Sequence, residues 1–391
     1  MKFSLLRSWT FLLVLAVLAA VSWAPAPAIP QASRELQTTD SLPAAEFSRL
    51  VRDLSEEDGY FRSDNFTSNE TSYLHVVDRL HEMRISGGAY IGVGPEQNFT
   101  YIAKIRPRIA FIVDIRRQAM LQHLLYKALF HISESRADFL SALLCRPLAG
   151  DGAPARDASI ERLLEYFGSG PAREEVFSAN LVRVRKIIRD DFQLPLSEQD
   201  EERLKYVYSA FHKQGLEIAF RIDGANWASD IRRFPTLKDL ILQPDLNGKL
   251  GNFLAGEDDY RFVRSLHLRN RIIPVVGDFA GPRALASVGG YLRTNGYTVR
   301  AFYTSNVEQF LFDNGVFRGF VDNVRKLPID ENSVFIRAVA TRGQPHPAYV
   351  PGHRTTTILQ RIVLFLKDYD EGAYTDYRGL VTKHFIAGQQ P

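Results

Sequence analysis

Short apolar runs alternate with amphipathic stretches in two parts of the chain, residues 46–145 and 261–391. Five runs predict strands, and the run at 109–115 is apolar on both faces, as in a buried parallel strand. These runs lie at 88–93, 109–115, 271–281, 298–306 and 333–339. The stretches between them predict helices, with a long helix or a helix pair at 116–144. Strands that alternate with helices predict an α/β fold with a doubly wound, mostly parallel sheet.

The alternation is interrupted between residues 146 and 260. A stretch rich in glycine and proline is followed by charged helical segments near 158–190 and 197–214 and by a candidate strand at 215–224. We interpret 146–260 as a largely helical insertion or cap within the α/β domain. Ahead of the first strand, 44–55 has helical spacing, and Ser68 or Asn69 is a candidate cap for a helix through Leu80.

The N-terminus has a different pattern. Lys2 and Arg7 precede an apolar run from Phe11 to Val21, and small residues and prolines follow. This pattern predicts that residues 1–28 are a secretory signal peptide, or, if it is not cleaved, that residues 8–26 anchor the chain in a membrane. Residues 29–45 are polar and small, and we interpret them as a linker. We therefore expect a periplasmic, extracellular or membrane-anchored protein that contacts the membrane only through this segment.

Composition and charge limit the kinds of partner and ligand that we expect for this chain. The chain is 45% hydrophobic and 24% charged, as in globular proteins. Its formal net charge of +3 falls to about +1 without Lys2 and Arg7, which argues against a nucleic-acid partner. Cys145 is the only cysteine, and we expect it to be a buried apolar residue. His346 and His353 are separated by two prolines, which is not a metal-ligand spacing, so we expect no metal.

Candidate chemistry begins after the first predicted strand. Gly92 and Gly94 follow it, and Asp114 ends the next strand, 20 residues after Gly94. Glycines let the backbone turn sharply and let a ligand lie against it, and a carboxylate at the strand end can accept both hydroxyls of a ribose. The pattern predicts a site for an adenosine-type ligand. The alternative is a tight turn, with Asp114 capping the next helix or pairing with Arg116 or Arg117.

The loop sequence bears on which cofactor fits. Gln97 stands where the dinucleotide fingerprint has its third glycine, and Glu96 would repel a pyrophosphate. A cofactor with a positive centre and no phosphate fits better, and S-adenosylmethionine is such a molecule. An NAD-dependent oxidoreductase is therefore disfavoured.

Polar residues also end the later strands. Asp278 can accept a hydrogen bond from an adenine amino group, while Ser305 and Asn306 lie at another strand end and Glu308 opens the next helix. We take Asp278, Asn306 and Glu308 as candidates to orient or deprotonate a substrate. The alternative is helix capping, for which Ser305 and Asn306 are suitable residue types.

Four segments together resemble a family of uncharacterised bacterial proteins with a methyltransferase-like fold. They are 63–76, 90–130, 274–293 ("PVVGDFAGPRALASVGGYLR") and 302–312 ("FYTSNVEQFLF"), and the resemblance covers about 45–340. It implies a Rossmann-like sheet of methyltransferase type, in which Gly92, Gly94 and Asp114 match the cofactor loop and the ribose acid, and from which Gln97 departs. It also implies that the segment ahead of the first strand folds over the cofactor, so that Tyr73 lines the site. The alternative is that Tyr73 packs beneath a capped helix.

The function expected from these observations is that of a methyltransferase-like protein that binds S-adenosylmethionine or a related adenosyl ligand and acts on an unknown substrate. It conflicts with the predicted export signal, because this cofactor is made and kept in the cytosol. The alternative is a non-catalytic, exported or anchored protein that uses the same fold to bind a small molecule.

Overall fold

The computed structural model describes residues 41–150, 152–222, 234–340 and 344–388. The predicted signal or anchor, residues 1–28, and residues 29–40 of the predicted linker lie outside these ranges. Within the described residues, no helix has the length and apolar character needed to cross a membrane.

A six-stranded sheet organises the described chain. Its strands are β2 (Ala89–Gly92), β3 (Ile109–Asp114), β5 (Ile272–Val276), β6 (Val299–Ser305), β7 (Val334–Ala340) and β8 (Thr355–Arg361). They lie in the order β5-β3-β2-β6-β7-β8. The first five are parallel and are the five predicted strands, whereas β8 pairs antiparallel with β7. Because the chain first extends the sheet in one direction and then in the other, β2 and β6 flank the topological switch point.

Helices cover both faces of the sheet, as expected for a doubly wound arrangement. One group comprises α5 (Gln97–Ile105), α6 (Arg117–Ile132) and α13 (Glu257–Leu268), where α13 packs on both α5 and α6. The other comprises α3 (Ala44–Leu54), α14 (Ala284–Thr294) and α16 (Phe317–Val324), where α14 packs on both α3 and α16. Short helix α15 (Val307–Asp313) follows β6, while α17 (Ile362–Asp370) and α18 (Tyr377–Thr382) follow β8.

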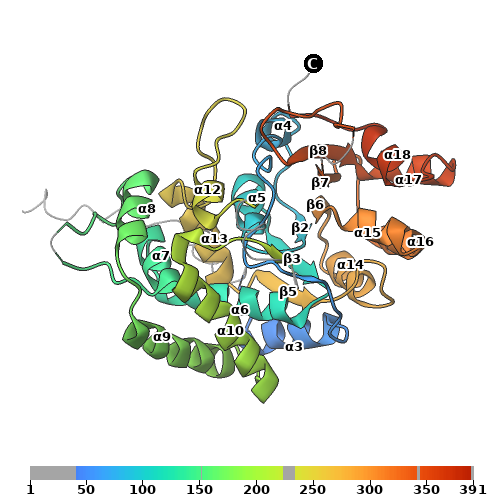
Figure 1. Cartoon of the computed structure of the whole chain (residues 1–391). Helices are drawn as coiled ribbons and strands as arrows, with labels where there is room; N and C mark the ends of the chain where they lie inside the picture. Colours follow the sequence, from blue (N-terminus) through green and yellow to red (C-terminus); the bar gives the residue numbers. More distant parts are fainter. Residues whose placement is uncertain (1–40, 151, 223–233, 341–343, 389–391) are drawn as a thin grey trace, which may run out of the picture. The chain divides into compact units, whose positions relative to one another are not determined.

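The region between α6 and α13 is largely helical. It contains α7 (Arg136–Leu144), α8 (Ile160–Ser169), α9 (Glu174–Lys186), a π-helical turn (Ile187–Asp191), α10 (Glu198–Gln214), a 3-10 turn (Gly215–Glu217) and α12 (Leu237–Ile241). Figure 1 shows α7–α10 to one side of the sheet and α14–α18 to the other. Helix α10 packs on α6, so this region shares the core of the sheet domain.

Two expected elements differ from those observed, and the structure decides between two alternatives for a third. The candidate strand at 215–224 is reduced to two-residue β4 (Arg221–Ile222), which pairs with β1 (Ser63–Asp64) outside the main sheet, because the 3-10 turn takes up its first residues. The helix expected from Ser68 or Asn69 begins later, as α4 (Val77–Glu82), because the Ser68 hydroxyl bonds to Gln97. The long helical stretch at 116–144 is a pair, divided at Ser135, whose capping box with Asp138 starts α7.

Candidate functional site

A cavity of about 210 Å³ lies over the carboxyl ends of β2, β3, β5 and β6, at the switch point of the sheet. Its walls come from the segments that follow these strands, from α15, and from residues of the segment 60–70 ahead of β2. Ligands of open α/β sheets bind at this place, because the loops there diverge to the two faces of the sheet. The cavity is therefore the candidate site.

The two glycines of the first loop have different roles. Gly94 lines the cavity at φ +77°, and a Cβ there would meet nothing within 4 Å, so the backbone is open to a ligand. A Cβ on Gly92 would lie 1.9 Å from Oδ1 of Asn98, and Gly92 does not line the cavity. The Asn98 amide donates to the carbonyls of Val93 and Pro95 at 2.9 and 2.7 Å. The absence of a side chain at Gly92 therefore leaves space for the Asn98 side chain, whose hydrogen bonds hold the loop in shape.

His123 supports the same loop from α6. Its Nε2 lies 2.8 Å from the carbonyl oxygen of Gly94. A carbonyl only accepts, so Nε2 carries the proton in this pair. Burial lowers the pKa of His123 to about 4, and the ring is therefore neutral near pH 7. The loop is held by neutral contacts and brings no charge of its own into the cavity.

Asp114 lines the cavity at the end of β3 and is paired with Arg116, which is the alternative that the sequence left open. The guanidinium contacts both carboxylate oxygens, with Nε to Oδ1 at 3.0 Å and Nη2 to Oδ2 at 2.9 Å. Burial raises the pKa of Asp114, but the charge and hydrogen bonds of Arg116 lower it more, so the carboxyl is ionised. Oδ1 also accepts from the backbone N–H of Arg116 at 3.0 Å, whereas Oδ2 keeps a lone-pair site for another donor.

The later strand ends bring three more of the predicted residues to the cavity. Asp278 follows β5, and its Oδ1 accepts from the backbone N–H of Ala280 at 2.9 Å. Ser305 and Asn306 follow β6 and line the same cavity. Asn306 is the residue before α15, but its side chain makes no capping bond. The Asn306 side chain therefore does not cap α15.

Glu308, one of the predicted catalytic candidates, is not among the residues that line the cavity. It is fully buried and forms an ion pair with Arg337, with Oε1 2.8 Å from Nη2. Thr304 donates to its other oxygen at 2.8 Å. The carboxylate is held inside the fold by a partner from the neighbouring strand.

Tyr73 is also absent from the cavity wall. Its hydroxyl donates to the carbonyl of Leu240 at 2.7 Å and accepts from Asn252 at 3.0 Å, so it packs under the helices instead. The segment ahead of β2 does reach the cavity, but through Thr67, Ser68, Asn69 and Glu70.

Gln97 lies behind the cavity wall and links the first loop to that segment. Its side-chain oxygen accepts from the Ser68 hydroxyl, and its amide donates to Glu70 at 2.9 Å. The residue that departs from the dinucleotide pattern therefore positions Glu70, which the sequence analysis did not single out. The one signal for Glu70 is that its segment was expected to cover the site, and nothing in the spacing distinguishes it from its polar neighbours.

The charge and apolar character of the cavity follow from these placements. Three carboxylates line it, Glu70, Asp114 and Asp278, and the single basic side chain among its described lining residues is Arg116. Much of the remaining wall is formed by aromatic side chains, namely Tyr60, Phe61, Phe220, Phe279, Tyr303 and Phe310. Phe61 and Phe310 meet edge to face at 4.9 Å between ring centroids, and Tyr60 is 76% exposed.

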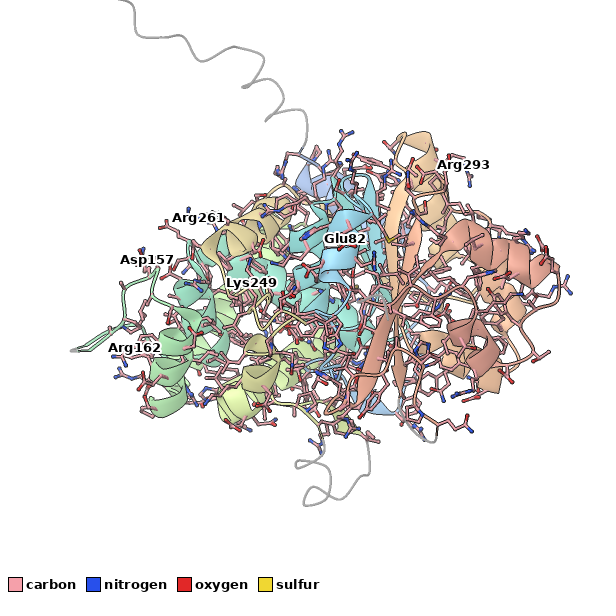
Figure 2. The ribbon with its side chains drawn as sticks, turned by 90° about the horizontal axis from the view of Figure 1, so that it is seen from above. Glu82, Asp157, Arg162, Lys249, Arg261 and Arg293 are labelled. Carbon is pink, nitrogen blue, oxygen red and sulfur yellow. The ribbon has the colours of Figure 1, made fainter. Side chains whose placement is uncertain are left out.

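The arginine-rich segment 261–271 makes no contribution to the cavity. Arg261 points outward, as Figure 2 shows, and Arg264 donates to the backbone carbonyl of Ser133 at 2.6 Å. The other arginine-rich stretch, 231–235, lies mostly outside the described residues. His346 bonds to the carbonyl of Val381 at 2.9 Å. In the described ranges, no group of three or more His, Cys, Asp or Glu residues is arranged to hold a metal.

Comparison with known proteins gives a family without a function. Among curated proteins, none matches the chain. One family does match, over residues 65–147 and 174–384, and these ranges include the cavity residues Glu70, Gly94, Asp114, Asp278 and Ser305. The chain therefore belongs to the family described as a domain of unknown function, DUF7790.

Proposed function

We propose that the cavity binds S-adenosylmethionine or a closely related adenosyl ligand, and that the chain is a methyltransferase-like protein. The observation that carries this proposal is that three carboxylates and an aromatic wall line the same cavity. The one basic side chain of the wall is already bonded to Asp114, so the site offers an anion little attraction. Aromatic faces and carboxylates both attract cations. Such a cavity therefore favours a cofactor with a positive centre and no phosphate over a cofactor with a pyrophosphate.

The predicted contacts can be assigned along the cavity. Asp278, beyond β5, suits an adenine amino group, and Asp114, beyond β3, suits a ribose hydroxyl through the lone pair that Arg116 leaves on Oδ2. The open backbone at Gly94 suits the centre of the ligand. Ser305 and Asn306, beyond β6, then face the reacting end. The order of these contacts follows the order of the strands in the sheet.

The sheet is compatible with both the methyltransferase type and a dinucleotide-binding type, because the strand order up to β7 is shared and doubly wound sheets can carry an antiparallel edge strand such as β8. The first loop distinguishes the two types, because Gln97 fills the position of the third glycine.

Methyl transfer needs little chemistry from the protein. When the cofactor is bound, its sulfonium supplies the activated methyl group. The chain holds the acceptor in line and excludes water, and alignment alone accounts for much of the rate in such reactions. The aromatic rim suits an apolar or aromatic acceptor, and the acidic lining disfavours a phosphorylated one. Asn306, at the reacting end, stays a candidate to orient it, whereas Asp278 is assigned to the adenine.

Calorimetric titration of the full-length chain, kept in a mild detergent, tests this function. We expect saturable binding of S-adenosylmethionine and S-adenosylhomocysteine, and none of NAD at the same concentrations. Asp114→Asn removes the charge at constant size, and we expect it to weaken both adenosyl ligands about tenfold. Binding of NAD alone, or of none of the three, would overturn the proposal.

The predicted export signal favours a second candidate, a non-catalytic protein that binds a small molecule in the same cavity. The two candidates differ in turnover. Methyl transfer from labelled S-adenosylmethionine to small-molecule extracts of the producing cell supports the first, while tight binding without transfer supports the second.

A further inference from the structure

Glu70 is a buried carboxylate that still lines the cavity, with 2% of its surface exposed. Three neutral side chains donate to it. Gln97 and the Tyr303 hydroxyl reach Oε2 at 2.9 and 2.8 Å, and the Ser305 hydroxyl reaches Oε1. All the partners of Glu70 that the described residues provide are neutral, in contrast to Asp114 with its arginine. The negative charge of Glu70 is therefore oriented by the protein but not neutralised by it.

The donors around Glu70 are themselves held in place. Gln97 is fixed by Ser68, and Ser305 has a left-handed backbone, with φ +53°. Such a conformation costs a non-glycine residue of order 1 kcal/mol and persists where the surroundings impose it. Hydrogen-bond donors stabilise a carboxylate in its charged form, yet a buried charge without a counter-ion is unfavourable. Burial accordingly raises the pKa of Glu70, and the three hydrogen bonds offset part of that rise. A cation in the cavity would complete the arrangement.

Resting on the function proposed above, we propose that Glu70 selects the positive charge of the ligand, by contact with its amino-acid ammonium or with its sulfonium. Oε2 already accepts two hydrogen bonds, whereas Oε1 accepts one and retains a lone-pair site. Glu70 lies beside Ser305 at the end of β6, whereas Asp278 follows β5, on the far side of β2 and β3 in the sheet. The charged end of the ligand and its adenine thus meet different carboxylates.

Glu70→Gln in the full-length chain tests this assignment against a series of ligands. S-adenosylmethionine carries both positive groups, S-adenosylhomocysteine lacks the sulfonium, and 5′-methylthioadenosine lacks both. We expect Glu70→Gln to weaken S-adenosylmethionine about 30-fold, which corresponds to about 2 kcal/mol, and to leave 5′-methylthioadenosine within about threefold of wild type. Binding of the neutral ligand also reports that the variant is folded.

The matched control is Asp278→Asn, which removes a carboxylate from the same cavity. We expect it to weaken charged and neutral ligands alike, because both have the adenine. A loss confined to S-adenosylmethionine in Glu70→Gln assigns the contact to the sulfonium, and a loss shared by S-adenosylhomocysteine assigns it to the ammonium. An equal loss for all three ligands, or no loss, would overturn the assignment while leaving the proposed function intact.

A measurement on the wild type needs no variant. The affinity ratio of S-adenosylmethionine to 5′-methylthioadenosine should fall as the pH is lowered, because protonation removes the charge of Glu70, whose pKa is raised by burial. A constant ratio would contradict the assignment. Failure of the wild type to bind any adenosyl ligand would instead refute the proposed function.

Discussion

At the residue scale, the segment ahead of β2 and the first loop are joined by carboxyl and amide side chains that solvent barely reaches. Glu96 is the least satisfied of them. Its Oε1 accepts from the Ser68 backbone N–H at 3.3 Å, while Oε2 is buried without a partner among the described residues. Burial raises the pKa of Glu96 to about 7. The proton on this carboxyl therefore affects the stability of the fold near neutral pH.

The pH dependence that Glu96 causes has a defined direction. Between about pH 4.5 and 7 the folded chain keeps a proton that the unfolded chain has lost, so stability falls as the pH rises through this window. Glu96→Gln keeps the acceptor for Ser68 and cannot ionise. We expect it to stabilise the fold at pH 8 by about 2 kcal/mol and to have little effect at pH 5. Thermal unfolding at the two pH values measures this.

Glu82→Gln is the control, since Glu82 lies on the surface of α4 (Figure 2) and forms a surface ion pair with Arg79. It should shift neither midpoint by more than a degree or two. A Glu96→Gln variant with the same effect at both pH values would show that Glu96 is already ionised in the fold.

At the element scale, the ion pair of Glu308 with Arg337 ties the start of α15 to β7. Both side chains are fully buried, and Arg337 also donates to Gln360 of β8 at 2.6 Å. Three elements at this side of the sheet thus share one charged cluster. Such a pair is costly to break from one side only, because the remaining charge stays buried.

We expect Glu308→Gln to lower the free energy of unfolding by about 3 kcal/mol, while the folded variant binds S-adenosylmethionine like the wild type. Chemical denaturation and titration on one preparation separate the two effects. The double variant Glu308→Leu with Arg337→Met should recover most of the loss, because no charge is left unpaired. Lost ligand affinity at full stability would return Glu308 to the site.

Comparison of particular elements shows what the sequence could predict. The five parallel strands were predictable because they are short apolar runs bounded by glycine or polar residues. Strand β8 was not predictable, since its threonines at 355–357 are not apolar. Thr357 is nevertheless buried, and its hydroxyl forms a hydrogen bond with the Ser72 hydroxyl at 2.8 Å. At the site, Gly94, Asp114, Asp278, Ser305 and Asn306 were predictable from their positions at strand ends. Strand ends fix where the backbone goes but not which partner a side chain finds. The sequence therefore did not show that Glu308 pairs with Arg337 away from the cavity or that Glu70 lines it.

At the scale of the whole molecule, the predicted signal segment and the proposed cofactor require different compartments. The positive flank of the apolar run at 11–21 predicts that the N-terminus stays inside and the body crosses the membrane. An alkaline phosphatase reporter fused after residue 40 should therefore be active, since this enzyme needs an oxidising compartment. A green fluorescent protein fused at the same place is the control for retention. Fluorescence without phosphatase activity would contradict export.

The link between Gln97 and Glu70 has a consequence for any attempt to exchange the cofactor. A glycine at position 97 would bring the loop closer to the dinucleotide pattern, but it would also remove the amide that holds Glu70 and the acceptor for Ser68. The carboxylate would stay in the cavity and repel the incoming phosphates. Redesign toward a dinucleotide therefore has to change two stretches of the chain at once, and a series of single substitutions would pass through variants that bind neither cofactor.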